Sequence, residues 1–378
     1  MSESHGVELR IAVAGGILSR ADADALGDEA RRRQQSPLVL LVERGLLSEQ
    51  SFESFRAQAL DVVALRDDGA LTVTGEPGAE PRGPDDLAFP VPGWDRYQPG
   101  RFLGRGGMGL VFLAHDPRLR RDVAIKFVRG DDPAHVQRLI SEARAQALVS
   151  HARVCKVHEV GEVEGKVYIA MQYISGASLG AMAHELTVEQ KVRLIRDAAE
   201  GLHEAHRATV IHRDIKPSNI MVERSSDGEL RSYVMDFGLA RSTKDDAATL
   251  SGTVLGTPRY MSPEQARGHT STLDRRTDVY SLGATLYHLV TGQPPVAGEA
   301  VLQVLDNLRT AEPTAPRTLN PDIPVDLEAI LLKCLERDRS ERYDSARALA
   351  EDLGRFLDGD PVHARAAGAW YRLRKRAV

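Results

Sequence analysis

Three segments of the sequence contain residues that could bind phosphate groups and a metal ion. The first, residues 103–111, has the spacing Gly-x-Gly-x-x-Gly-x-Val. Glycines let a backbone approach phosphates closely and point N–H groups at them. Taken alone, this pattern is as consistent with a plain hairpin or a dinucleotide-type loop as with a loop that covers the phosphates of another kind of site. A dinucleotide-binding loop should open a helix, whereas residues 111–114 continue as a strand, which disfavours that alternative.

The second segment places a lysine in a short strand pattern, seventeen residues after Gly109. In Val-Ala-Ile-Lys, residues 123–126, the alternation puts Lys126 on the opposite face from Ile125 in a half-buried strand. A lysine there needs an anion. The candidates are Glu142, in the helical segment 136–149, and a nucleotide phosphate. A solvated strand lysine remains the alternative when the segment is considered by itself.

The third segment, residues 212–219, concentrates a carboxylate, a cation and an amide oxygen in His-Arg-Asp-Ile-Lys-Pro-Ser-Asn. Such a density of polar groups is rarely structural alone. Asp236-Phe237-Gly238 follows 22 residues after Asp214 and puts a second carboxylate beside a flexible glycine, where it could hold a metal ion. By itself, that tripeptide would be interpreted as a turn.

Together these motifs resemble the protein kinase family, specifically the bacterial serine/threonine kinases that look like the eukaryotic ones. The resemblance covers about 260 residues and includes Ser262-Pro263-Glu264 as its last catalytic element. It implies a bilobal α+β kinase fold, with a small β-rich N-lobe containing one key helix and a larger α-helical C-lobe. It also implies ATP-dependent transfer of the γ-phosphate to Ser/Thr hydroxyls of proteins, in bacterial signal transduction.

The resemblance assigns a role to each motif. Asp214 would accept or orient the proton of the substrate hydroxyl, and Lys126, paired with Glu142, would contact the α- and β-phosphates. Lys216 would lie near the γ-phosphate. The implied catalytic residues are Asp214, Lys126, Lys216, Glu142 and Asn219.

ATP and Mg²⁺ are the implied cofactors, with Mn²⁺ as a substitute. Asn219 and Asp236 would hold the metal ion. Met171 would be the gatekeeper and residues 172–174 the hinge. The apolar side chains of Leu103, Val111, Ala124 and Met221 would enclose the adenine ring. The implied nucleotide-binding residues are Leu103, Gly104, Arg105, Gly106, Gly107, Met108, Gly109, Val111, Ala124, Lys126, Met171, Gln172, Tyr173, Ile174 and Met221.

Lys216 and the segment Gly256-Thr257-Pro258 look like the serine/threonine subclass rather than the tyrosine subclass. Arg213 resembles the arginine of kinases whose activation loop is ordered when a phosphate pairs with it. We therefore expect autophosphorylation of the activation loop, in transient homodimers. The candidate phosphorylation sites are Thr249, Ser251 and Thr253.

Two further positions concern the fold. Asp278 matches a buried aspartate that braces the catalytic loop, and Arg342 matches an arginine that pairs with Glu264. The sequence also departs from the family pattern at three positions, none of which touches the transfer chemistry. Gln172 replaces a common glutamate, Met108 an aromatic residue, and Arg339 a common proline.

The elements that must position these motifs form an ordered series. Residues 1–65 have helical spacing and favour a small all-α module of three or four helices, including Pro37 to Arg44 and Glu49 to Leu60. Residues 66–93 are rich in proline and glycine and indicate a linker. Beyond it, strand patterns come first and helical patterns dominate after about Val188. The predicted kinase domain is 94–357, with an N-lobe of about 94–174, a C-lobe of about 175–357, and a basic tail, 358–378.

The composition, with 42% apolar and 27% charged residues, is that of a globular protein. A formal net charge of -5 argues against a nucleic-acid binder. Cys155 and Cys334 suggest neither a disulfide nor a zinc site, are expected to be buried, and fit a reducing cytoplasm. No secretion signal or membrane span is evident. The basic tail fits a solvated helix end or a juxtamembrane segment, so the chain is either a cytoplasmic kinase or the cytoplasmic part of a membrane-anchored one.

Three functions compete. An active kinase acting on protein substrates is favoured because Lys126, Asp214, Asn219 and Asp236 are all intact. The alternatives are a nucleotide-binding pseudokinase that serves as a scaffold, and a kinase that regulates a partner-binding module in residues 1–65.

Overall fold

The computed structural model describes residues 22, 26, 29–30, 33, 36–44, 87–106, 109–128, 133–225, 227–237, 258–268, 273–298 and 301–365. The chain divides into two compact units, residues 1–68 and 69–378. In the first unit, helix α3 spans Pro37–Glu43, which confirms the helix predicted there. Leu40 and Leu41 are buried. The helix predicted from Glu49 lies outside the described residues.

The second unit contains strands early in the chain and helices later, as the sequence indicates. Its strands are β1 (Gln98–Gly106), β2 (Gly109–Asp116), β3 (Arg121–Val128), β4 (Val157–Val163), β5 (Lys166–Gln172), β6 (Gly176–Ser178), β7 (Ile220–Arg224) and β8 (Leu230–Val234). Its α-helices are α5 (Pro133–Ala147), α6 (Leu179–Met182), α7 (Val188–Arg207), α9 (Pro263–Ala266), α10 (Arg276–Thr291), α11 (Val301–Thr310), α12 (Pro316–Leu319), α13 (Val325–Cys334) and α14 (Ala346–Asp358). The 3₁₀ turns are η1 (Pro217–Asn219) and η3 (Pro258–Tyr260).

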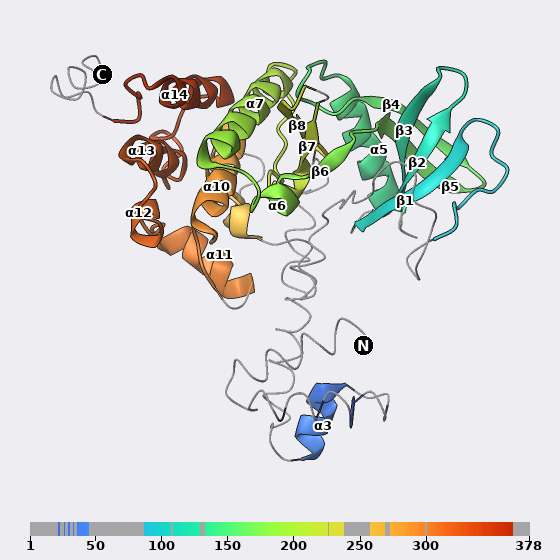
Figure 1. Cartoon of the computed structure of the whole chain (residues 1–378), viewed down its shortest axis with the longest axis horizontal. Helices are drawn as coiled ribbons and strands as arrows, with labels where there is room; N and C mark the ends of the chain where they lie inside the picture. The colour runs from blue at the N-terminus through green and yellow to red at the C-terminus, as the bar shows by residue number, and fades with distance from the viewer. Residues whose placement is uncertain are drawn as a thin grey trace. The chain divides into compact units, whose positions relative to one another are not determined.

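A five-stranded antiparallel sheet in the order β1-β2-β3-β5-β4 forms the N-lobe together with α5. A smaller sheet, β6-β7-β8, belongs to the C-lobe with the remaining helices. Figure 1 shows the five strands at one end of this unit and helices α10 to α14 at the other. This arrangement confirms the predicted bilobal α+β fold, and the boundaries predicted for the individual domains stay predictions.

Strand β3 is buried on both faces, so the half-buried strand expected around Lys126 is wrong in that respect. Ile125 lies on the opposite face from Lys126, as predicted, and belongs to an aromatic-rich cluster on the sheet. Phe89 and Trp94 cover this cluster, with Phe89 5.3 Å from the ring of Phe127. Residues just before β1, partly within the predicted linker, therefore seal the outer face of the sheet.

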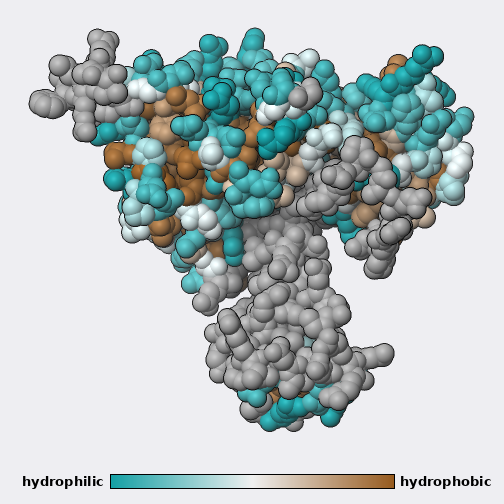
Figure 2. Space-filling view, viewed as in Figure 1, coloured by the Kyte–Doolittle hydropathy of each residue, from teal (hydrophilic) through white to brown (hydrophobic). Residues whose placement is uncertain are grey.

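The C-lobe is built around α10, a helix whose residues from Thr277 to Tyr287 are all buried. A helix that is buried all round sits in the middle of a core, and α7, α13 and α14 pack in the same hydrophobic cluster. Helix α7 begins at a capping box formed by Thr187 and Gln190. On the face seen in Figure 2, hydrophobic residues gather between the helices of this lobe.

Several smaller predictions can be checked here. Cys155 and Cys334 are free and buried, as expected. In the basic tail, Arg365 pairs with Asp326 at 3.0 Å, and residues from 366 onward lie outside the described residues. Within the described part of the chain, no helix is both long and apolar enough to cross a membrane.

Candidate active site

A buried carboxylate at the start of α10 accepts hydrogen bonds from the loop that contains Asp214 and fixes its backbone. Asp278 is fully buried, and its two oxygens accept the backbone N–H groups of His212 and Arg213, each at 2.8 Å. His206, near the end of α7, donates from Nε2 to the same carboxylate at 2.7 Å. Burial alone would raise the pKa of Asp278, but the bonds and charges of the two histidines outweigh burial and lower it. The brace predicted for this aspartate is confirmed.

Arg213 has a positive φ of 65°, which is unusual for a residue with a side chain. Two hydrogen bonds hold it in this conformation. Its N–H donates to Asp278, and its carbonyl accepts from Gln265 Nε2 at 2.8 Å. A strained backbone of this kind persists only where its surroundings fix it, and here it turns the chain so that Asp214 follows directly.

Asp214 is oriented by two residues of the same predicted motif. Asn219 Nδ2 donates to the Asp214 backbone carbonyl at 2.8 Å and to its carboxylate at 3.1 Å. Lys216 Nζ lies 3.5 Å from the same carboxylate oxygen. Because the Asn219 amide nitrogen is used by Asp214, the amide oxygen is the atom that remains for a ligand.

Asp236 and Lys126 meet across the cleft between the lobes, although 110 residues separate them. Lys126 Nζ donates to Asp236 Oδ1 at 3.0 Å. Burial would raise the pKa of Asp236, but the charge of Lys126, with smaller contributions from His212 and Lys216, lowers it overall. The sequence proposed Glu142 as the partner of Lys126, and the side chain of Glu142 lies outside the described residues.

The backbone just before Asp236 is bonded to the catalytic loop. His212 Nε2 donates to the carbonyl of Met235 at 2.7 Å, and Met235 N–H donates to the carbonyl of Asn219 at 2.9 Å. Asp236 itself has a positive φ of 45°. The two carboxylates, Asp214 and Asp236, therefore sit on segments tied directly to each other. His206 and His212 contribute to this arrangement but were given no role in the sequence analysis.

Beside these polar groups, one apolar cluster joins both lobes. It contains every apolar residue predicted to surround adenine, and the predicted hinge continues from it. Its buried members are Leu103, Val111, Ala124, Ala143, Cys155, Ile169, Met171, Ile174, Met221, Tyr233 and Met235. Gln172 N–H donates to the carbonyl of Lys156 at 2.8 Å, which fixes the start of the hinge, and Tyr173 packs against the cluster.

The described part of the glycine-rich segment forms the end of β1 and the start of β2, with Arg105 opposite Leu110 and Gly106 opposite Gly109. Gly109 is required by packing, because a Cβ atom there would lie 2.0 Å from the carbonyl oxygen of Phe127. This hairpin agrees with the strand continuation seen in the sequence. Gly107 and Met108 lie outside the described residues, and so do Thr249, Ser251 and Thr253.

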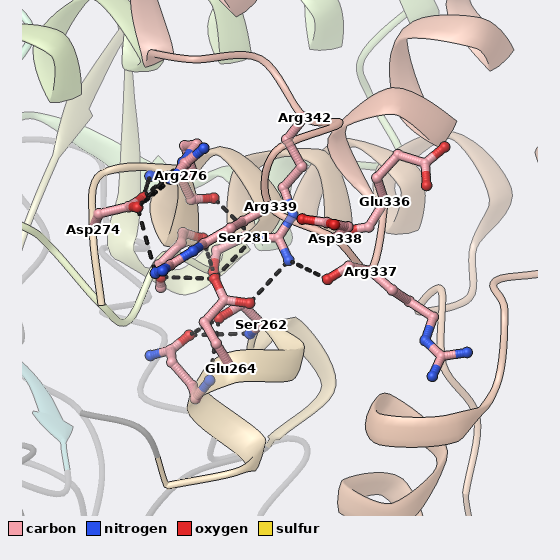
Figure 3. Close-up of polar contacts among 12 residues, drawn as sticks. Ser262, Glu264, Asp274, Arg276, Ser281, Glu336, Arg337, Asp338, Arg339 and Arg342 are labelled. Carbon is pink, nitrogen blue, oxygen red and sulfur yellow. Dashed lines mark hydrogen bonds and ion pairs between the residues drawn. The ribbon is translucent and has the colours of Figure 1, made fainter. Parts of the chain in front are cut away.

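A second ion pair, farther from the cleft, joins α9 to the loop before α14. The two terminal guanidinium nitrogens of Arg342, Nη1 and Nη2, donate to the Glu264 carboxylate at 2.8 and 2.9 Å, which confirms the predicted pair. Thr277 Oγ1 donates to the same carboxylate at 2.9 Å. Figure 3 shows Arg342 reaching toward Glu264 and the neighbouring loop, while Arg276 and Arg339 surround Asp274.

Comparison with known proteins shows which family and which proteins this chain is similar to. The family model described as "Protein kinase domain" matches residues 97–353. The serine/threonine-protein kinase PknB of Mycobacterium leprae is 39% identical over 281 residues, which are 71% of this chain and 44% of that protein. A probable serine/threonine-protein kinase of Streptomyces coelicolor is 40% identical over 284 residues, covering 72% of this chain and 41% of that protein. The chain thus spans less than half the length of these relatives.

Solved structures agree with the sequence matches. The kinase domain of PknI from Mycobacterium tuberculosis superposes with a TM-score of 0.55 and 26% identity, covering 71% of this chain and 98% of that domain. A double mutant of the same PknI domain superposes with a TM-score of 0.56 and 25% identity, covering 70% of this chain and 96% of that domain. The chain belongs to the protein kinase family, and its kinase domain is of the bacterial serine/threonine type.

Proposed function

We propose that this chain is an ATP-dependent kinase that transfers the γ-phosphate of ATP to serine and threonine hydroxyls of protein substrates. One observation carries the proposal: Asp214, Asn219 and Asp236 are held on mutually bonded segments, with Lys126 bonded to Asp236. Phosphoryl transfer needs positioned charge more than covalent chemistry, and these groups supply it.

In this proposal, Asp214 receives or orients the proton of the substrate hydroxyl. Its carboxylate is held by Asn219 and Lys216, which limits its rotation and keeps it ready for an incoming hydroxyl. Lys216 lies close enough to Asp214 to meet the transferred phosphate, where its positive charge would offset the developing negative charge.

Protein kinases use ATP and a divalent cation. The donor set here fits Mg²⁺, with Mn²⁺ as a substitute, because the Asn219 amide oxygen and the Asp236 carboxylate are oxygen ligands and phosphate oxygens and waters can complete the shell. When bound, the cation neutralises charge on the phosphates. Lys126 would contact the α- and β-phosphates, with Glu142 as its second partner. The hairpin of Leu103 to Val111 would cover them.

The adenine ring would lie within the apolar cluster, between Leu103, Val111 and Ala124 of the N-lobe and Met221 of the C-lobe. All four are less than 10% exposed. Residues 172–174 would supply backbone hydrogen bonds to the ring, with Met171 as the gatekeeper. The Gln172 side chain should matter little, because the backbone makes those contacts.

We also propose that phosphorylation of the activation loop, at Thr249, Ser251 or Thr253, switches the enzyme on. Arg213 Nε is buried and has no hydrogen-bond partner among the described residues. A buried guanidinium nitrogen of this kind is suited to a phosphate, which carries three strong acceptor oxygens. Transfer between two copies in a transient homodimer would supply that phosphate.

The test is transfer of radiolabel from [γ-³²P]ATP with Mg²⁺, comparing wild type with Asp214→Asn and Lys126→Met and mapping the labelled residues. We expect label on serine or threonine in wild type and a loss of about 10²–10⁴-fold in Asp214→Asn. If wild type and both variants transfer equally little, even after addition of candidate activators, while ATP still raises Tm, the scaffold alternative replaces this proposal.

A partner-binding role for residues 1–65, a membrane-surface role for the basic tail, and a cytoplasmic location stay predictions. Deleting residues 1–65 and comparing kinase activity with partner recruitment separates the first of these from a kinase that acts alone.

A further inference from the structure

Helix α5 carries a buried polar side chain, Gln146, beside the small cavity that Lys126 and Asp236 also line. Gln146 is only 6% exposed and follows Leu139 and Ala143 at helical spacing on the buried face. These three residues line a cavity of about 20 Å³ that also contacts Lys126 and Asp236. A polar group in such surroundings is unfavourable unless it is hydrogen-bonded, so the partner of Gln146 matters.

That partner is the backbone of the segment that follows α5. Gln146 Nε2 donates to the carbonyl oxygen of Cys155 at 2.7 Å. Because a carbonyl can only accept, the bond also fixes which way the amide points. One side chain therefore joins the helix to residues 153–156, which lead into β4.

Residues 153–156 are in turn bonded to the strand that leads to Asp236. Val234 N–H donates to the carbonyl of Arg153 at 2.8 Å, and Cys155 N–H donates to the carbonyl of Val234 at 3.0 Å. Val234 is the last residue of β8 and lies two positions before Asp236. The segment also receives the bond from Gln172 N–H to Lys156 that fixes the start of the hinge.

We propose that Gln146 is a positioning residue for phosphoryl transfer. Its bond to Cys155 fixes the position of α5 relative to β8, the strand that leads to Asp236, and relative to Gln172, the first hinge residue. Glu142, the proposed partner of Lys126, precedes Gln146 by about one helical turn on α5, so a displacement of α5 would displace Glu142. The inference rests on the proposed function, because Glu142 has a task only if the chain transfers phosphate.

The test removes the hydrogen bond while keeping the size of the side chain. Gln146→Met has a similar length and still favours a helix, and Gln146→Leu serves as a second variant if the first does not fold. We expect kcat/KM for ATP in the [γ-³²P]ATP assay to fall about tenfold, which corresponds to about 1.4 kcal/mol in the barrier. Arg144→Met, on the exposed face of the same helix, is the matched control and should transfer phosphate at the wild-type rate.

A double-mutant cycle separates positioning from a merely structural role. In a Glu142→Gln background, Gln146→Met should cost little more, because the group that it positions is already altered. Full activity of Gln146→Met and Gln146→Leu in otherwise wild-type enzyme, or losses that multiply in the double variant, would overturn the proposal.

Hydrogen–deuterium exchange tests the link without relying on activity. In Gln146→Met, backbone amides of residues 153–156 and 230–234 should exchange faster than in wild type and in Arg144→Met. If wild type transfers no phosphate, the proposed function fails while this measurement still decides whether the link exists. Unchanged exchange would show that Gln146 does not hold these segments together.

Discussion

Two ion pairs in this kinase domain have similar chemistry and different surroundings. Arg342 and Glu264 form a bidentate pair with side chains 0% and 9% exposed, and Thr277 adds a third bond to the carboxylate. Lys126 and Asp236 are joined at 3.0 Å beside a small cavity between the lobes, with side chains 10% and 32% exposed. The first pair is enclosed by protein, whereas the second keeps a carboxylate within reach of a ligand.

The difference indicates what each pair does. Arg342 also donates to the carbonyls of Glu336 and Arg276 and lies 4.9 Å from the centre of the Tyr280 ring. A buried charge with this many partners cannot be released without leaving others unsatisfied. The pair of Lys126 and Asp236 can be exchanged for contacts with phosphates and metal at lower cost, since about a third of the Asp236 side chain is exposed and fewer other groups depend on it. We therefore expect the first pair to govern stability and the second to govern activity.

The largest effect should follow from breaking the enclosed pair. Arg342→Met leaves the Glu264 carboxylate buried, with Thr277 as its remaining side-chain partner among the described residues, and should lower the free energy of unfolding by about 3–5 kcal/mol. Urea denaturation followed by circular dichroism measures this loss. Activity per folded molecule should stay near that of wild type, and a stability change below about 1 kcal/mol would contradict the assigned role.

Breaking the pair of Lys126 and Asp236 should lower activity much more than stability. Lys126→Met should lower kcat/KM for ATP by about 10²–10³-fold, because one preorganised positive group near the phosphates is lost. Its free energy of unfolding should fall by less than that of Arg342→Met, since the Asp236 side chain keeps 32% of its surface exposed and the Glu264 side chain only 9%. If the variant instead melts far below wild type with normal activity once folded, the two pairs have been assigned in the wrong order.

Sequence reasoning predicted the enclosed pair better than the pair of Lys126 and Asp236. Both Glu264 and Arg342 were named in advance because the resemblance supplies them as partners. For Lys126, the sequence indicated a strand position and an anionic partner, but the 110 residues to Asp236 give no local signal of that contact. The pairing of Lys126 with Glu142 stays a prediction. The contact with Asp236 depends on how the two lobes pack, and hydrophobic periodicity does not report that.

The same limit explains the other differences. The order of strand and helix patterns indicated two lobes, and the family resemblance implied the kinase fold. The burial of both faces of β3, however, depends on Phe89 and Trp94 packing from outside the sheet. Gln146 carried one signal that could have been used, since it is a polar residue at helical spacing from Leu139 and Ala143. Its acceptor is a backbone carbonyl, however, and every residue has one. The residue type at position 155 therefore gives no sign that its carbonyl accepts this bond.

A pH dependence sharpens the comparison. Burial would raise the pKa of Glu264, but the hydrogen bond and charge of Arg342 outweigh burial and lower it in the folded protein. The unfolded chain therefore takes up this proton first on acidification, so the contribution of the pair is present above about pH 4.3 and is lost as the pH falls through the folded value. Without Arg342, burial raises the folded pKa of Glu264 in the variant, whereas the unfolded state is the same for both proteins. The stability difference between wild type and Arg342→Met should therefore shrink as the pH falls from the raised folded pKa of the variant to the lowered folded pKa of wild type, with a slope of up to about 1.4 kcal/mol per pH unit. A difference that is constant down to acid unfolding would contradict the ion-pair explanation.

The smallest effect is expected at Arg339, where the sequence departs from the family's common proline. Arg339 lies 3.5 Å from Asp274, with side chains 39% and 35% exposed, and Asp274 is already bonded to Arg276 at 2.7 Å. Exposed pairs contribute about 0–1 kcal/mol, and here the carboxylate keeps its better partner. Arg339→Met should thus change the free energy of unfolding by less than about 1 kcal/mol in the same urea experiment. Arg339 and Arg342 are three residues apart in one loop, so a loss from Arg339→Met as large as that from Arg342→Met would mean that disturbance of the loop, rather than burial of the ion pair, sets the stability of this region.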